Sequence, residues 1–283
     1  MNIGLVIVNY NDSDNVIKLI KNIKSFKSVK MIVVVDNNSF TSELNKIKEL
    51  KVKNVKVIEN DNNYGYAYAL NIGAKYINEN LNNAFIVLSN TDIEIPSEKV
   101  LLSMAKKIND NIKCVMPKVK EGNNYKYGWK LTSSIKDLIA NIPLLNRIFR
   151  KDIINYSEEY FKNNNVVDVI YGCFFMIEGK TLKDINYFDD KTFLYYEEYI
   201  LARKLEKINK KSVVDTEVFV SHIHNAVIGS NINKLRKYKI YKKSQLYYEK
   251  KYNRANFIEM FFFRLFYIIN LIPYEIKNIL KRL

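Results

Sequence analysis

Four short apolar runs recur near the start of the chain, and each one stops at polar or acidic residues. The runs are Ile3 to Val8, Met31 to Val35, Val55 to Ile58 and Phe85 to Leu88. Runs of this length, bounded by turn-forming residues, are typical of buried parallel strands. Helical patterns fill the three intervals, so right-handed crossovers and one mostly parallel sheet are expected. The sequence therefore predicts an α/β fold.

Asn and Asp side chains follow the ends of these runs. Asn9 and Asn11 follow the first run, Asp36 follows the second, and Asn90 and Asp92 follow the fourth. In open α/β sheets, ligands bind outside the carboxyl ends of the strands, so these side chains should converge on one crevice. An Asp beside an Asn suits a hard divalent cation that can also bridge substrate phosphates. The same residue types are also common in simple turns, so a bare Asn-x-Asp does not decide the matter.

The third run leads into a loop that contains Asn63 and Gly65, followed by an expected helix from Ala67 to Asn78. Gly65 stands where a strand-to-helix loop needs backbone freedom or close approach. Gly73 within the helix predicts a tight packing contact. No G-x-G-x-x-G occurs here, so the dinucleotide-binding fingerprint is excluded.

The middle of the chain is harder to organise. Pro96 to Ile108 has the pattern of a helix, and Glu121 to Asn165 is interpreted as an insertion over the site. Short strands are expected at Val166 to Val169 and Cys173 to Ile177, and a late strand at Val218 to Val220.

Two adjacent acids, Glu197 and Glu198, open a helix that is expected to reach Ile208. Acids at a helix N-terminus are favoured by the helix dipole, so their placement alone permits a purely structural role. The functional alternative is a carboxylate held at the mouth of the crevice. His222 and His224 are the only histidines, and their alternation in an extended segment would place both rings on one side. One of them could bind a metal.

Composition and charge narrow the class of protein. The 283 residues, 48% of them hydrophobic, are ample for one sizeable core. Cys114 and Cys173 have neither metal-ligand nor disulfide spacing, which indicates a reducing cytoplasm, and the first residues predict a strand and not a signal peptide. The net charge of +15 is concentrated near the end, where residues 231–283 hold 13 Lys or Arg and 3 Asp or Glu.

The apolar, aromatic run from Phe257 to Ile272 lies within this basic region. It is too short and too charged for a membrane-spanning helix. Basic flanks around Phe, Tyr and Leu are typical of segments that lie on an anionic membrane surface. Packing on the main domain or in a dimer interface is the alternative. No nucleic-acid-binding module is recognised, so nucleic acid is not an expected partner.

Five polar segments follow one another along the chain. They are Val6 to Asn11, Val35 to Ser39, Asn62 to Gly65, Leu88 to Asp92 and Phe193 to Glu198. In their order and spacing, residues 3–225 resemble the family 2 glycosyltransferases, and in particular their bacterial rhamnosyl- and galactofuranosyltransferase-like members. The resemblance implies a GT-A domain, placed here over residues 1–228, a UDP- or dTDP-sugar donor, Mn²⁺ or Mg²⁺, and inversion at the anomeric carbon. The basic region that follows, residues 229–283, is expected to be helical from its own pattern.

The resemblance also implies roles for individual residues. The family's Glu-Asp pair, whose second member is the general base, corresponds here to Glu197 and Glu198. This departure from Asp leaves open which of the two acts. The implied donor-binding residues are Asn9, Asn11, Asp36, Asn63, Gly65 and Asn90, and the implied metal ligands are Asp92 and His222, with His224 the weaker choice.

The expected activity is transfer of a hexosyl or deoxyhexosyl group to a hydroxyl of a cell-surface glycan precursor or lipid-linked acceptor. The expected place is the cytoplasmic face of the plasma membrane. A sugar-phosphate nucleotidyltransferase is an alternative, but its Gly- and Arg/Lys-rich triphosphate loop is missing between Val8 and Ser13. A non-catalytic binding protein of the same fold is the other alternative, and the joint presence of Asp92, Glu198 and His222 argues against it.

Overall fold

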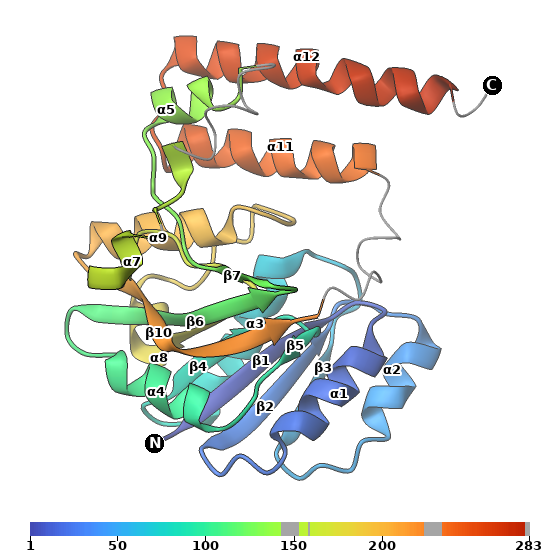
Figure 1. The fold of residues 1–283 in the computed structure, drawn as a ribbon. Helices are drawn as coiled ribbons and strands as arrows, with labels where there is room; N and C mark the ends of the chain where they lie inside the picture. Colours follow the sequence, from blue (N-terminus) through green and yellow to red (C-terminus); the bar gives the residue numbers. More distant parts are fainter. Residues whose placement is uncertain (143–152, 158, 224–233, 281–283) are drawn as a thin grey trace.

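One mixed sheet with helices on its faces forms the body of the protein (Figure 1). The computed structural model describes residues 1–142, 153–157, 159–223 and 234–280. Along the main path of the sheet the strand order is β3-β2-β1-β4-β9-β6-β10-β5. Outside this path, β7 pairs with β6 and β8 pairs with β10. The order reverses between β1 and β4, which is where a doubly wound sheet opens a crevice.

The four predicted strands are confirmed and pair in parallel. They are β1 (Ile3–Asn9), β2 (Val29–Asp36), β3 (Val55–Glu59) and β4 (Phe85–Ser89). The apolar side chains of β1, β2 and β4 are almost entirely buried, because helices cover both faces of this half of the sheet.

The second half of the sheet is mixed. The antiparallel strand β9 (Phe174–Glu178) lies between β4 and β6, and β10 runs parallel to β6. The remaining strands are β5 (Ile93–Glu94), β6 (Ile112–Glu121), β7 (Asn124–Lys126), β8 (Val166–Val167) and β10 (Lys211–His222).

Two strands are longer than the sequence pattern predicts. The stretch around Pro117 lies inside β6, although it mixes proline and lysine with apolar residues. The late strand expected at Val218 to Val220 is the end of the twelve-residue β10. The register between β10 and β6 shifts between Asp215 and Phe219, and such an irregularity breaks the alternation by which strands are recognised.

The helices α1, α2, α3 and α4 connect the early strands, and α8 follows β9. Gly73 in α3 makes the predicted tight contact, because a Cβ there would lie 2.4 Å from Cγ1 of Val6. The expected helix from Pro96 begins three residues late, as α4. The bounds are α1 (Ser13–Ile23), α2 (Thr41–Lys48), α3 (Tyr66–Asn80), α4 (Lys99–Lys107) and α8 (Gly179–Asp184).

A helical C-terminal part is confirmed. The long helices α11 (Lys234–Lys251) and α12 (Phe257–Leu280) lie side by side, separated from the sheet by α9 (Glu197–Lys207) (Figure 1). In the described part of the predicted insertion lie the short helices α5 (Ser134–Ile139) and α7 (Tyr160–Asn163). In the described ranges, no helix has the length and apolar character needed to cross a membrane. The expected boundary at residue 228 lies outside the described residues.

Candidate active site

The parallel register brings the polar strand ends to one edge of the sheet. Asn9 pairs with Asp36, and Ile7 pairs with Ser89, so that Asn90 follows directly at the same level. The strand pairing therefore brings these polar strand ends together at one edge of the sheet, as predicted.

Asn9 and Asp36 form a buried polar pair at the ends of β1 and β2. Asn9 Nδ2 donates to Asp36 Oδ1 at 2.7 Å and to Ser39 Oγ at 3.1 Å. The backbone N–H of Ser39 donates to the other Asp36 oxygen at 2.9 Å. Asn11 is attached to the same loop, because its N–H donates to Ser39 Oγ at 2.8 Å. These bonds fix the shape of the loop, and the contact of these residues with a nucleoside stays a prediction.

The loop before α3 is tied to the loop after β2. Asn37 Nδ2 donates to Asn63 Oδ1 at 2.9 Å and to the Gly65 carbonyl at 3.1 Å. Gly65 has φ of 98°, and a Cβ there would lie 2.5 Å from the Phe193 carbonyl oxygen. The requirement for glycine predicted at this position is thus confirmed, since both the backbone conformation and the space exclude a side chain.

Asn90 is held from two sides. Its N–H donates to the Cys173 carbonyl at 2.8 Å, and its Oδ1 accepts from the Tyr66 hydroxyl at 3.0 Å. The backbone of Tyr66 in turn donates to the Phe193 carbonyl at 2.8 Å. The segment before α9 therefore lies against the loop at the start of α3.

Asp92, His222 and Glu121 form a linear cluster. His222 Nε2 lies 3.1 Å from Asp92 Oδ1, and Nδ1 lies 2.9 Å from Glu121 Oε1. The antiparallel pairing of β10 with β5 places them, and the N–H of Ile223 donates to the Asp92 carbonyl at 2.9 Å. Tyr171 donates its hydroxyl proton to Glu121 at 2.7 Å. Burial alone would lower the pKa of His222, but the two carboxylates raise it above its usual value.

Glu121 and Tyr171 are functional candidates that the sequence did not reveal. Glu121 ends β6, and a carboxylate at a strand end was the signal that identified Asp92. The mixed pattern around Pro117 does not predict β6, so the sequence gives no strand end at Glu121. His222 lies in this cluster, and His224 lies outside the described residues.

Glu197 and Glu198 open α9 directly after two left-handed residues. Tyr195 and Tyr196 have φ of 73° and 75°, a costly conformation for a bulky side chain. A Cβ on Gly172 would lie 1.8 Å from Glu198 Oε1, so the Glu198 carboxylate rests directly against that glycine. Glu197 is buried, and its Oε1 has no hydrogen-bond partner.

The pKa shifts indicate that these carboxylates share one region. Burial raises the pKa of Cys173, and so do the nearby charges of Asp92, Glu121 and Glu198. Burial raises the pKa of Glu198, and burial together with the Glu198 charge raises that of Glu197. The geometry agrees, because Glu198 rests on Gly172 and the next residue, Cys173, accepts from the N–H of Asn90, two residues before Asp92. The start of α9 therefore lies close to the loop that carries Asp92.

Helix α11 supports the segment that carries these glutamates. Ser244 Oγ donates to the Leu194 carbonyl at 2.8 Å, and the hydroxyls of Tyr196 and Tyr241 lie 3.2 Å apart. The rings of Tyr196 and Tyr248 also contact each other, with centroids 5.3 Å apart. The strained turn before α9 is thus held in place by the C-terminal helices.

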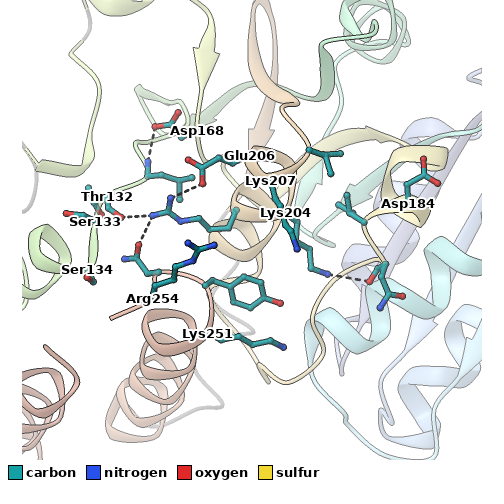
Figure 2. A pocket seen from close by; sticks show the side chains of 17 residues that line it. Thr132, Ser133, Ser134, Asp168, Asp184, Lys204, Glu206, Lys207, Lys251 and Arg254 are labelled. Carbon is teal, nitrogen blue, oxygen red and sulfur yellow. Dashed lines mark hydrogen bonds and ion pairs between the residues drawn. The ribbon is translucent and has the colours of Figure 1, made fainter. Parts of the chain in front are cut away.

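A cavity of about 1020 Å³ lies beside the C-terminal half of α9 (Figure 2). Arg203 donates from Nη2 to the Thr132 carbonyl at 2.8 Å and to Asn253 Oδ1 at 2.6 Å, joining α9 to α5 and to the end of α11. None of the predicted donor, metal or base residues lines this cavity. A smaller one, of about 440 Å³, is lined by Asp92 and Lys18.

Comparison with protein families decides the family of the chain. The model described as Glycosyl transferase family 2 matches residues 5–185. The chain belongs to this family. In this family 2 chain the matched segment runs from β1 past α8, so it includes Asp92, whereas Glu198 and His222 lie beyond it.

Similar proteins include a curated hexosyltransferase and several solved structures. The low-salt glycan biosynthesis hexosyltransferase Agl10 of Haloferax volcanii is 26% identical over 228 residues, which are 79% of this chain and 67% of that protein. The mannosyltransferase of Pyrobaculum calidifontis, solved with GDP-Man and Mn²⁺, is 13% identical with a TM-score of 0.57. The alignment covers 90% of this chain and 65% of the mannosyltransferase, so the chain spans less than two thirds of that protein.

Two further structures have the same architecture. TarS of S. aureus, residues 1–349, is 15% identical with a TM-score of 0.52, covering 91% of this chain and 74% of TarS. The glucosyl-3-phosphoglycerate synthase of Mycobacterium tuberculosis, solved with Mg²⁺ and UDP, is 12% identical with a TM-score of 0.55. The alignment covers 90% of this chain and 81% of the synthase. These likenesses confirm the expected GT-A fold of the family 2 chain.

Proposed function

We propose that this protein is an inverting, metal-dependent glycosyltransferase that moves a sugar from a nucleotide-diphosphate sugar to a hydroxyl group of a glycan precursor. The observation that carries the proposal is that the Glu198 carboxylate rests on Gly172, whose neighbour Cys173 is bonded to Asn90 in the loop that leads to Asp92 and His222. A base and a site for a charged leaving group are the two requirements of a direct displacement.

In the proposed reaction Glu198 is the general base. The acceptor hydroxyl gives its proton to the Glu198 carboxylate while its oxygen forms a bond to the anomeric carbon. The bond from that carbon to the diphosphate oxygen breaks, and its electron pair leaves with the nucleoside diphosphate. One displacement inverts the anomeric configuration and needs no enzyme nucleophile. A positioned base typically contributes about 10²–10⁴-fold to such a rate.

Asp92 and His222 have the chemistry of a site for Mn²⁺ or Mg²⁺. Asp92 Oδ1 is buried and lies 3.1 Å from His222 Nε2, so these two atoms are close enough to contact one cation together. Glu121 Oε1 lies 2.9 Å from Nδ1 of His222. A carboxylate on this nitrogen typically orients a metal-binding imidazole, and it would leave Nε2 to bind the cation. A bound cation would neutralise the charge that develops on the departing diphosphate.

Within the described residues, no group of three or more His, Cys, Asp or Glu is arranged as a complete metal site. Two protein ligands suffice if diphosphate oxygens and water supply the others, as is usual for Mg²⁺. The proposed site is therefore completed by the donor, and donor and cation should bind together.

The donor is proposed to be a UDP- or dTDP-sugar, with the nucleoside in the loops that hold Asn9, Asn11, Asp36, Asn63 and Gly65. Solved relatives carry GDP-Man or UDP, which supports a nucleoside diphosphate. The transferred group is proposed to be hexosyl or deoxyhexosyl, as in the rhamnosyl- and galactofuranosyltransferase-like branch.

The acceptor is proposed to be a lipid-linked or glycan precursor of a surface polysaccharide, reached from the cytoplasmic face of the plasma membrane. The name of the Haloferax relative, a glycan biosynthesis hexosyltransferase, supports a glycan product. The basic C-terminal region supports a membrane location.

Thermal unfolding with a panel of nucleotide sugars tests the donor assignment. At a donor concentration of about one hundred times Kd, binding adds about 2.7 kcal/mol to the free energy of unfolding. This should raise Tm by about 5 °C. We expect this shift for a UDP- or dTDP-sugar with Mn²⁺, and a smaller one with chelator. If no nucleotide sugar raises Tm, the proposal is wrong.

A further inference from the structure

The outer face of α12 is apolar and exposed from Phe257 to Ile272. Phe257 is 86% exposed and Ile268 is 57% exposed. Contiguous apolar surface of this kind marks a contact with a protein or a membrane. The exposed apolar residues are Phe257, Ile258, Phe261, Phe262, Leu265, Ile268, Ile269 and Ile272.

These side chains form one stripe. At 3.6 residues per turn, they fall within an arc of about 140° around the helix. Between Phe257 and Pro273 the only charged residues are Glu259 and Arg264. Glu259 accepts a hydrogen bond from Ser134 at 2.7 Å, so it is turned towards α5 and away from the stripe.

The opposite face of α12 is already occupied. Met260 and Phe263 are buried, the ring of Tyr267 contacts Tyr238 of α11, and Asn270 donates to the Asn141 carbonyl at 3.3 Å. The helix is thus fixed to the protein through its inner face, and only the outer face is available to a partner.

Charge distinguishes a lipid surface from a second copy of the chain. Residues 234–273 hold ten Lys or Arg and two Glu. Two copies meeting through α12 would bring these cations towards one another, whereas an anionic leaflet would attract them. Aromatic and aliphatic side chains on one face, with Lys and Arg nearby, are characteristic of helices that lie in the plane of a membrane interface.

We propose that α12 lies flat on an anionic bilayer, with the stripe around Phe261, Leu265 and Ile268 inserted among the lipid headgroups and upper acyl chains. This inference refines the membrane part of the proposed function, and it does not depend on the catalytic assignment. It assigns the contact to one helix face, while α11 and the α/β body stay on the aqueous side.

Flotation of the full-length protein with liposomes tests the proposal. We expect co-flotation with phosphatidylglycerol-containing vesicles and weaker binding to vesicles of phosphatidylcholine alone. Phe261→Glu and Ile268→Glu should each lower the vesicle partition coefficient by about tenfold or more, because each would place a charge where an apolar side chain is proposed to enter the lipid. Ile208→Glu is the matched control, since Ile208 is 39% exposed at the end of α9 and off the stripe.

Thermal unfolding of the variants confirms that they fold, which is expected for exposed positions. The proposal is overturned if the unmodified protein does not float, or if Ile208→Glu loses binding as much as Ile268→Glu does. A protein that stays off vesicles but sediments as a dimer, and becomes monomeric in Ile268→Glu, would assign the stripe to self-association. Glu198→Gln should float normally, so failure of the catalytic assignment and failure of this inference are told apart.

Discussion

At the scale of single residues, the contact between Glu198 and Gly172 is the most specific feature of the candidate site. The glutamate comes from the start of α9, and the glycine comes just before β9. Any side chain at residue 172 would occupy the position of the Glu198 carboxylate. This glycine therefore serves to leave room for the proposed base.

Gly172→Ala should displace the Glu198 carboxylate, because the new methyl group would lie 1.8 Å from Oε1. A displacement of about 1 Å can cost roughly 10²-fold in rate. We expect kcat for sugar transfer to fall by about that factor while donor Kd changes little, and steady-state kinetics with a donor titration measures both. An unchanged kcat would show that the position of Glu198 does not matter.

Asp92→Ala should weaken Mn²⁺ binding, since it removes the proposed carboxylate ligand at a strand tip. Calorimetric titration of Mn²⁺ in the presence of nucleoside diphosphate measures this independently of turnover. Glu94→Ala, two residues away and exposed in β5, removes the same charge and serves as the control. Equal Mn²⁺ affinity in the two variants would contradict the metal assignment.

The sequence predicted individual residues where local pattern and function coincide. Asp92 and Gly65 lie in the polar loops that follow apolar runs, so their places could be inferred. Glu121, Tyr171 and Gly172 could not, because their roles depend on how β6 and β9 lie beside β4. That pairing brings together residues that are far apart in the chain, and no single segment encodes it.

At the scale of elements, α11 joins the C-terminal helices to the body through a buried polar network. Glu249 is fully buried in α11, and Asn253 donates to Glu249 at 2.8 Å and to Asp137 of α5 at 3.1 Å. Burial and the nearby Asp137 carboxylate raise the pKa of Glu249 to about 9. Loss of the Glu249 proton should therefore destabilise this network.

This proton gives stability a predictable pH dependence. The unfolded chain releases it near pH 4.3, whereas the folded protein holds it until about pH 9. Stability should thus fall as pH rises through this window, because the folded state binds more protons. Glu249→Gln, which is neutral throughout, should lose less Tm between pH 6 and pH 9 than the unmodified protein. Differential scanning calorimetry measures Tm of both proteins at each pH. If Tm falls equally with pH in both, the Glu249 proton does not contribute to stability as proposed.

Elements were predicted well where helices cover both faces of a strand. The runs that became β1 and β2 are uniformly apolar because both faces are buried. Strand β10 was only partly predicted, since its register shift and its charged residues hide the pattern. Amphipathic helices such as α1, with its buried Val16, Leu19 and Ile20, were recognisable from spacing alone.

At the scale of the whole molecule, the proposed donor site at the strand ends and the stripe on α12 are separate surfaces, with α9 and α11 between them (Figure 1). Deleting Phe257 to Leu283 would test the role of the stripe poorly, because it would also expose the parts of α11 and α5 that cover Met260 and Phe263. Single substitutions on the outer face avoid this.

The central claim is that Glu198 is the base of a metal-dependent sugar transfer. The most direct measurement is the rate of nucleoside diphosphate release with Mn²⁺, using the donor identified by thermal shift, in the unmodified protein, Glu198→Gln and Glu197→Gln. Glutamine keeps the shape of the side chain but cannot accept the proton. The account predicts a loss of about two to four orders of magnitude in Glu198→Gln, with donor Kd retained, and a smaller loss in Glu197→Gln. Full activity of Glu198→Gln, or of the unmodified protein in chelator, would contradict it.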